Sequence, residues 1–259
     1  MRTPSFPHLE QPCSLCLGPG AHAVALDRQG RRLWWTDAEG ARAIDLSESA
    51  RACRLHGREI ILLTDDDELV RLDATGARLA SMRLNADARA FAITPGGSAI
   101  VVYGRRGVQE HGVVMQRLSD SPLEWTEAPL LDAVAVACGS GEVWVAGTGT
   151  QAPLARAIRL RPVPGSYKVL ESVALPRPPR AAAVGPDGAL YLVLEPGESI
   201  MRVHRGQAST PRSLSAPVRD VARGGGSLWG CGPRGLVDLT GYVPAAPDPI
   251  EFTPPPCSP

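Results

Sequence analysis

The feature that most constrains the fold is a phrase that recurs along the whole chain. It consists of a short strand rich in alanine and valine, a turn, a strongly apolar strand, a polar turn and a third alternating strand. The first strands of successive copies begin near residues 22, 52, 90, 133, 181 and 218, a mean step of about 39 residues. A single copy cannot bury its own apolar face, so the copies must stack on one another.

Steps near 40 residues with about four strands each are typical of a β-propeller blade. The innermost strand lines a crowded channel and favours small residues, whereas the second strand is covered on both faces and is apolar throughout. Large aromatic residues are expected in that second strand, namely Trp34 or Trp35, Trp144, Tyr191 and Trp229. The sequence therefore predicts an all-β, six-bladed β-propeller, with five or seven blades as alternatives.

The closure of the ring follows from which repeats lack an outer strand. Only Ser47–Ala50 separate the third strand of the first repeat from the second repeat, so the first repeat looks short. The last repeat needs an outer strand, and we predict that the N-terminal segment His8–Leu17 supplies it; Tyr242–Phe252 is the rival. Either closure removes exposed sheet edges. Residues 1–252 are then one propeller domain, and residues 253–259 are a Pro-rich C-terminal tail.

One repeat carries a recognisable motif, in which Gly185-Pro186-Asp187-Gly188 is followed by Ala189-Leu190-Tyr191-Leu192-Val193. It resembles the PDG-x-LY-(V/L) phrase of NHL-type and related six-bladed propellers, which include the SMP-30-like lactonases. It differs from WD40 repeats, because no Gly-His and Trp-Asp pair recurs. The lactonases place acidic and asparagine ligands around a channel metal. This chain has a single asparagine, Asn85, and Asp220 is the one acid expected near the channel. The resemblance implies the architecture without the catalytic pattern.

Other catalytic signatures are missing from the sequence. The glycine pattern within Glu142–Ala152 imitates a dinucleotide-binding turn, but Pro153 follows at once and prevents the helix that such a turn needs. There is no G-x-S-x-G nucleophile elbow and no HExxH zinc motif. We therefore predict no catalytic residues, no cofactor and no enzymatic activity.

The six cysteines and the charge balance bear on compartment and partners. Cys13, Cys16, Cys53 and His56 could supply four zinc ligands, and the sequence leaves this open. Sparse cysteines, and an N-terminus without the apolar core of a secretory signal, favour the cytoplasm. No apolar run reaches 18 residues, which argues against a membrane partner. The net charge of zero argues against nucleic acid held by bulk electrostatics.

The remaining candidates are charged turns between second and third strands, which emerge on one face of a propeller. This face is expected to bind a protein partner through an acidic and a basic set: Asp37, Glu39, Asp65, Asp66, Asp67, Glu68, Glu195 and Glu198, with Arg105, Arg106 and Arg234. The predicted function is a non-catalytic scaffold in a multi-subunit, bacterial cytosolic assembly. A sensor that binds a small ligand or sugar in the channel is the alternative, and a lactonase-like metal-dependent hydrolase is the second alternative.

Overall fold

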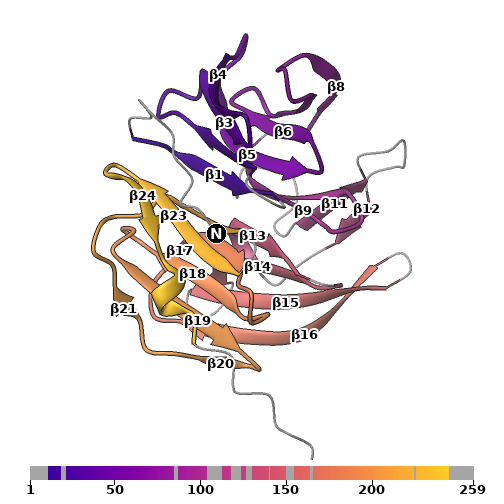
Figure 1. Ribbon diagram of the computed structural model, residues 1–259. Coiled ribbons are helices and arrows are strands. Elements are labelled where there is room, and N and C mark those ends of the chain that lie inside the picture. Colours follow the sequence, from indigo (N-terminus) through magenta and orange to yellow (C-terminus); the bar gives the residue numbers. More distant parts are fainter. Residues whose placement is uncertain are drawn as a thin grey trace, which may run out of the picture.

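The chain forms an all-β propeller, as predicted (Figure 1). The computed structural model describes residues 11–18, 22–84, 87–103, 113–117, 124–126, 130–139, 141–149, 155–163, 166–224 and 226–244. Apart from one 3-10 turn, η1 (Thr240–Tyr242), all regular structure in these ranges is β. No helix in this part of the chain has the length and hydropathy needed to cross a membrane.

Within the described residues, the strands pair into six antiparallel sheets, which are numbered along the chain. Sheet 1 contains β1 (Ser14–Leu17), β2 (Ala23–Leu26), β3 (Arg32–Asp37) and β4 (Gly40–Asp45). Sheet 2 contains β5 (Ala50–His56), β6 (Glu59–Thr64), β7 (Glu68–Leu72) and β8 (Arg78–Arg83). Sheet 3 contains β9 (Ala88–Ile93), β10 (Ser98–Tyr103), β11 (Val113–Arg117) and β12 (Glu124–Thr126).

The second half of the chain continues the pattern with three further sheets, of which sheet 4 has the longest strands. Sheet 4 contains β13 (Leu130–Cys138), β14 (Val143–Gly149), β15 (Ala155–Val163) and β16 (Ser166–Leu175). Sheet 5 contains β17 (Pro179–Val184), β18 (Leu190–Leu194), β19 (Ser199–His204), β20 (Gln207–Ala208) and β21 (Arg212–Ser213). Sheet 6 contains β22 (Asp220–Gly224), β23 (Ser227–Gly232) and β24 (Gly235–Asp238). Among the described residues, five sheets therefore have at least four strands and sheet 6 has three.

The innermost strands close the ring. They contact one another in the cyclic order β1, β5, β9, β13, β17, β22 and back to β1. The predicted N-terminal outer strand is wrong, because Ser14–Leu17 is the innermost strand of sheet 1 and pairs with β2. Leu15 is fully buried and Cys16 nearly so, which an exposed outer strand would not allow. The rival closure falls mostly outside the described residues, although Tyr242 itself lies in η1.

The predicted strand order of the first repeat is therefore wrong by one strand. Ala23–Leu26 is a second strand and not an innermost one, and Trp35 lies on the third strand, β3. Sheet 1 also has a complete outer strand, β4, so the repeat is not short. The sequence Ala-Val-Ala-Leu wrongly predicts an innermost strand, because small residues are typical of that position. The expected second-strand positions of Trp144, Tyr191 and Trp229 are confirmed on β14, β18 and β23.

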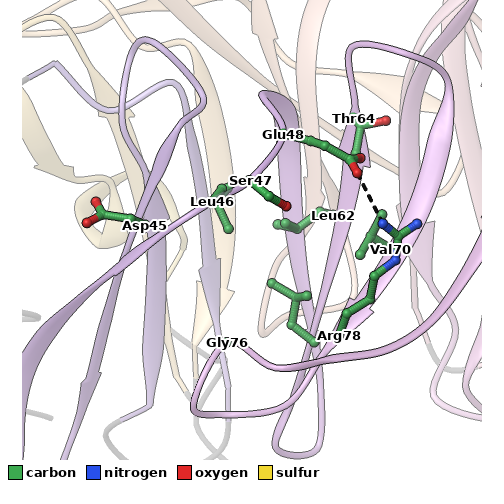
Figure 2. A pocket seen from close by; sticks show the side chains of 10 residues that line it. Asp45, Leu46, Ser47, Glu48, Leu62, Thr64, Val70, Gly76 and Arg78 are labelled. Atoms are coloured by element: carbon green, nitrogen blue, oxygen red, sulfur yellow. Dashed lines mark hydrogen bonds and ion pairs between the residues drawn. The ribbon is translucent and has the colours of Figure 1, made fainter.

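The apolar packing between neighbouring sheets differs around the ring. Sheets 1 and 2 pack through a cluster that includes Leu33, Trp35, Leu62 and Val70. Towards the outside, this packing leaves a groove of about 220 Å³, which is lined by apolar Leu62 and Val70 and edged by charged residues. Figure 2 shows Glu48 from the β4–β5 connection paired with Arg78 across this groove, at 3.1 Å.

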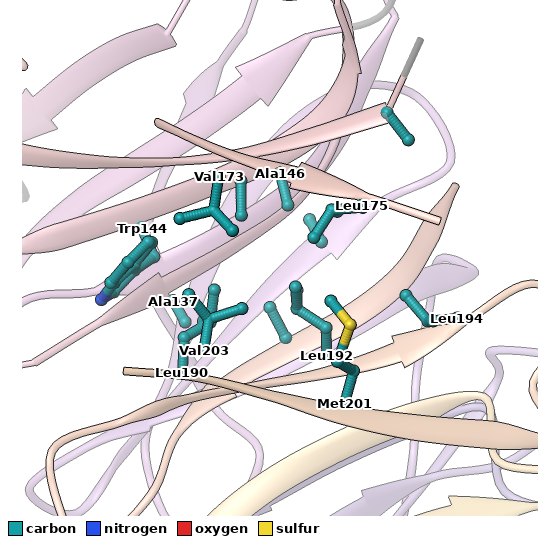
Figure 3. Close-up of a cluster of buried hydrophobic side chains, with 14 of the residues drawn as sticks. Ala137, Trp144, Ala146, Val173, Leu175, Leu190, Leu192, Leu194, Met201 and Val203 are labelled. Atoms are coloured by element: carbon teal, nitrogen blue, oxygen red, sulfur yellow. The ribbon is translucent and has the colours of Figure 1, made fainter. Parts of the chain in front are cut away.

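Sheets 4 and 5 share a larger apolar cluster, drawn in Figure 3. Trp144 and Val173 of sheet 4 belong to the same cluster as Leu192 and Met201 of sheet 5. Met201 is 1% exposed, so its truncation to alanine would cost about 2–5 kcal/mol. This buried cluster stabilises the contact between sheets 4 and 5.

The turn of the recognised motif has a clear physical role. Gly188 has φ of +74°, and its N–H donates to the Gly185 carbonyl at 3.1 Å. The Asp187 carboxylate accepts hydrogen bonds from the Tyr191 hydroxyl at 3.0 Å and from Arg202 Nε at 2.8 Å. Although burial raises the pKa of Asp187, the bonds from Arg202 and Tyr191 outweigh it and the net pKa is lowered. The motif thus ties the turn of sheet 5 to its second and third strands.

Candidate functional site

The predicted acidic turn between β6 and β7 is largely occupied by internal contacts. The Asp67 carboxylate accepts the N–H groups of Asp87 at 2.9 Å and Ala88 at 3.1 Å, and it forms an ion pair with Arg51. The Asp67 carbonyl accepts the N–H of Leu84 at 2.8 Å. Asp67 therefore holds the turn of sheet 2 against the start of β9, which is a structural role.

Equivalent turns in two other sheets make the same connection through their backbone. The Gly30 carbonyl accepts the N–H of Ala50 at 2.7 Å, and the Gly197 carbonyl accepts the N–H of Val218 at 2.8 Å. Gly30, Asp67 and Gly197 all have positive φ, at 69°, 58° and 104°. These turns contact the next sheet where its innermost strand begins. We call this end of the ring the entry face; it carries the turns β2–β3, β6–β7, β18–β19 and β23–β24.

The other acids of the β6–β7 turn differ in their availability. Asp65 is exposed but accepts the Ser49 hydroxyl at 2.5 Å. Glu68 pairs with Arg78 at 2.9 Å. Asp66 is exposed, and no ion pair joins it to another described residue. Only Asp66 of this group presents its charge outward without an internal partner among the described residues.

Three further predicted residues lie on the entry face. Glu195 is half-buried and pairs with Arg180 at 3.3 Å. Glu198 and Arg234 are exposed, and neither forms an ion pair within the part of the chain that the structure describes. The predicted basic residues Arg105 and Arg106 lie outside the described residues.

The placement of Asp37 and Glu39 on the same face is wrong. Both lie at the β3–β4 turn, which is the opposite end of β3 from the Gly30 turn. The error follows from the strand order of the first repeat. Neighbouring strands run in opposite directions, so a shift by one strand moves a turn to the opposite face of the ring. Asp37 also serves the fold: the Trp35 indole N–H donates to it at 2.7 Å and lowers its pKa. On the entry face, the true β2–β3 turn offers the exposed Arg28 and Arg31 instead.

A buried polar network joins three innermost strands at the centre of the ring. Asp220 of β22 is 8% exposed, and its Oδ2 accepts the Ser14 hydroxyl at 2.7 Å and the Leu15 N–H at 3.1 Å. Arg54 of β5 reaches the same oxygen at 3.1 Å. The other oxygen of Asp220 accepts the N–H of Val221 at 2.9 Å. Asp220 lies on an innermost strand as predicted, but both of its carboxylate oxygens already accept hydrogen bonds from neighbouring residues.

Arg54 is the central residue that the sequence reasoning missed. Burial by itself lowers the pKa of Arg54, but the Asp220 carboxylate raises it and the net shift is upward. The Arg54 guanidinium lies 5.7 Å from the centre of the Phe91 ring. It also acts electrostatically on Cys138 of β13, whose pKa burial raises to about 12. The signal that could have identified it was positive charge on an innermost strand, because β5 carries Arg51 and Arg54 where small residues were expected.

The candidate zinc ligands are not assembled as a metal site. Burial raises the pKa of the Cys13 thiol to about 12 and also raises the pKa values of Cys16 and Cys53. His56 packs instead against Gly97 in the β9–β10 turn. In the described ranges, no group of three or more His, Cys, Asp and Glu side chains is arranged to hold a metal ion. Cys16 and Cys53 are buried core residues and Cys13 is partly buried, and this burial strongly disfavours the reactive thiolate form.

Comparison with known proteins supports the fold and leaves the family undefined. No protein-family model and no curated protein sequence matches the chain. Solved structures do match over most of its length. A gluconolactonase from Xanthomonas campestris has a TM-score of 0.67 and 15% identity, covering 88% of this chain and 86% of its own.

Two other matches belong to the same structural group. An inactive virginiamycin B lyase from Staphylococcus aureus, solved with quinupristin, has a TM-score of 0.65 and 16% identity, covering 89% of this chain and 80% of its own. The calcium-binding protein regucalcin from Agrobacterium tumefaciens has a TM-score of 0.61 and 12% identity, covering 87% and 82%. The resemblance to NHL and SMP-30-like propellers is thereby confirmed as one of architecture. At these identities it establishes the fold alone.

Proposed function

We propose that the six sheets act as six blades of a binding propeller, which engages a protein partner through its entry face as a subunit of a larger bacterial cytosolic assembly. The observation that carries this proposal is the contrast between the centre and the entry face. At the centre, Arg54 and Asp220 neutralise each other and leave no free carboxylate on Asp220. On the entry face, exposed charges of both signs have no ion-pair partner among the described residues.

These exposed charges include Asp66, Glu198 and Arg234, each in a turn fixed to a rigid strand pair. Rigid presentation lowers the entropy that such side chains lose on binding, and opposite charges confer orientation on a partner. Rim charges of this kind affect the association rate and its salt dependence more than the dissociation rate.

The decisive experiment reverses charge where the fold does not depend on it. Asp66→Arg combined with Glu198→Arg should abolish capture of a stoichiometric partner from the native host, and a complex rebuilt from the two purified proteins should be weakened. The matched control is Glu39→Arg, because Glu39 is also exposed but lies on the opposite face. Equal capture by the double variant and the wild type would contradict the proposal. Asp65 and Asp67 are poor choices, since both make internal hydrogen bonds.

A metal-dependent hydrolase is the second candidate, because a gluconolactonase is among the structural matches. The donor set near the axis does not favour it: the Arg54 guanidinium occupies the space beside Asp220 where a divalent cation would need negative charge. A stoichiometric divalent ion in the purified protein, measured by mass spectrometry of the metal content, would favour the hydrolase over the scaffold.

A further inference from the structure

A second cavity lies beside sheet 5, close to the β18–β19 turn of the entry face. It has a volume of about 200 Å³ and is enclosed by β18, β19, the segment around β21, and the residues that follow β24 through η1. Its apolar lining includes Tyr242 and Ile200, and Ile200 is 2% exposed. A water molecule occupies about 30 Å³ and drug-sized ligands need about 300–1,000 Å³, so this cavity suits one side chain rather than a whole cofactor.

Two arginines border the cavity, and their surroundings differ. Arg202 donates to Asp187 through Nε at 2.8 Å, so its charge is met within sheet 5. Arg212 is exposed and forms no ion pair with a carboxylate in the described part of the chain. Arg212 is therefore a cation without a salt-bridge partner among the described residues, and the exposed Glu198 lies nearby, since its carbonyl accepts the Leu214 N–H at 2.9 Å.

The guanidinium of Arg212 is held in place by an aromatic platform. It lies 4.6 Å from the centre of the Tyr242 ring, within the range of a cation–π contact. The Tyr242 hydroxyl donates to the Ser213 carbonyl at 2.7 Å, which fixes the ring against the strand that carries Arg212. Stacking leaves the edge of the guanidinium plane, with its N–H donors, directed away from the ring. A planar, fixed arginine of this kind is suited to bidentate recognition of a carboxylate.

We propose that this cavity is a docking site for an acidic peptide segment of a partner protein, in which a glutamate pairs with Arg212 and a neighbouring aliphatic side chain enters the cavity. The charge complementarity comes from Arg212, and the apolar lining of Ile200 and Tyr242 accounts for the aliphatic residue. The site borders the β18–β19 turn but differs from the one in the proposed function, because Arg212 and Tyr242 lie outside the turns that define the entry face.

The test uses the full-length protein and a fluorescein-labelled peptide, Ala-Leu-Glu-Leu-Ala, with Ala-Leu-Gln-Leu-Ala as the matched peptide. Fluorescence anisotropy should show salt-sensitive binding of the glutamate peptide, weakened at least about tenfold when glutamine replaces the glutamate. Arg212→Gln should weaken binding of the glutamate peptide by a similar factor. Arg58→Gln, which removes an exposed arginine from the β5–β6 turn, should leave it unchanged.

The platform and the location are tested separately. Tyr242→Leu keeps the charge of Arg212 but removes the stacking, and it should weaken binding severalfold while circular dichroism shows the same β-sheet spectrum. The side-chain N–H resonances of Arg212 should shift on titration with the glutamate peptide. Equal binding of the two peptides, an equal loss in Arg212→Gln and Arg58→Gln, or no binding at millimolar peptide would each overturn the proposal. An Asp66→Arg variant, whose change lies in the β6–β7 turn of sheet 2, should bind the peptide as the wild type does, which separates this site from the entry face.

Discussion

Arg54 at the centre of the ring and Arg212 at its periphery differ in one decisive contact. Both guanidinium groups stack near an aromatic ring, Phe91 at 5.7 Å and Tyr242 at 4.6 Å. Arg54 also pairs with Asp220, whereas Arg212 pairs with no carboxylate among the described residues. The same residue type is thus structural in one region and available to a ligand in the other. The difference is set by the carboxylate that a distant strand supplies.

The largest effect is expected at the centre. Asp220→Ala should lower the free energy of unfolding by about 3 kcal/mol or more, because it leaves the Arg54 charge and the Ser14 hydroxyl buried without their acceptor. Urea unfolding followed by tryptophan fluorescence measures this. Arg54→Met combined with Asp220→Ala should cost less than the sum of the two single changes. A loss below about 1 kcal/mol for Asp220→Ala would remove the contrast with the periphery.

The next effect concerns the β6–β7 turn of sheet 2, whose Asp67 accepts hydrogen bonds from the start of sheet 3. Asp67→Ala should destabilise the protein by about 1–3 kcal/mol, because the Asp87 and Ala88 N–H groups lose their acceptor. The adjacent Asp66→Ala is the matched control and should change stability by less than about 0.5 kcal/mol. Thermal unfolding of both variants compares them directly. Similar losses in the two would mean that the Asp67 contacts contribute little.

A smaller effect should appear as a dependence on pH at sheet 5. The bonds from Arg202 and Tyr191 outweigh the effect of burial and lower the pKa of Asp187 in the folded protein, against about 3.9 in an unfolded chain. A lowered folded pKa contributes stability above about pH 4, and that contribution is lost as the pH falls through the folded value. Asp187→Asn should therefore flatten the acid limb of the stability curve. An unchanged slope below about pH 4 would show that Asp187 is not the group responsible.

The smallest effect on stability is expected at Arg212. Arg212→Gln should change the free energy of unfolding by less than about 0.5 kcal/mol, since the side chain is exposed and makes only one stacking contact. The same substitution should nevertheless abolish most peptide binding. A stability loss as large as that of Asp220→Ala would place Arg212 among the structural arginines and remove the distinction.

The repeat predicted most of the fold because strand periodicity is local information. Innermost strands such as β5 and β17, and the fully apolar second strands such as β6 and β18, were recognisable from a few residues each. The first repeat failed for the same reason. Ala23–Leu26 has the composition of an innermost strand but pairs on both sides, with β1 and β3. Local composition does not record how many neighbours a strand has.

The candidate site was less predictable than the fold. Charge placed Asp66, Glu198 and Arg234 on exposed turns of one face, but it also selected Asp67, whose carboxylate is occupied by the next sheet. Asp37 and Glu39 moved to the other face through a shift of a single strand. The contacts of Arg54 and Arg212 depend on residues 166 and 30 positions away, Asp220 and Tyr242. The spacing of residues in the sequence does not predict contacts that form only when the ring closes.

The amino-acid sequence by itself determined the repeating unit, since side-chain size and turn chemistry act within a few residues and specify each strand and hairpin. The tertiary structure alone decided the phase of the first sheet, the partner of each charge and the two cavities. These depend on which strands meet when the ring closes: β1 against β22, Arg54 beside Asp220, and Tyr242 under Arg212. A charged side chain has a structural role when folding brings an opposite charge next to it. Without such a partner, it remains available to a ligand.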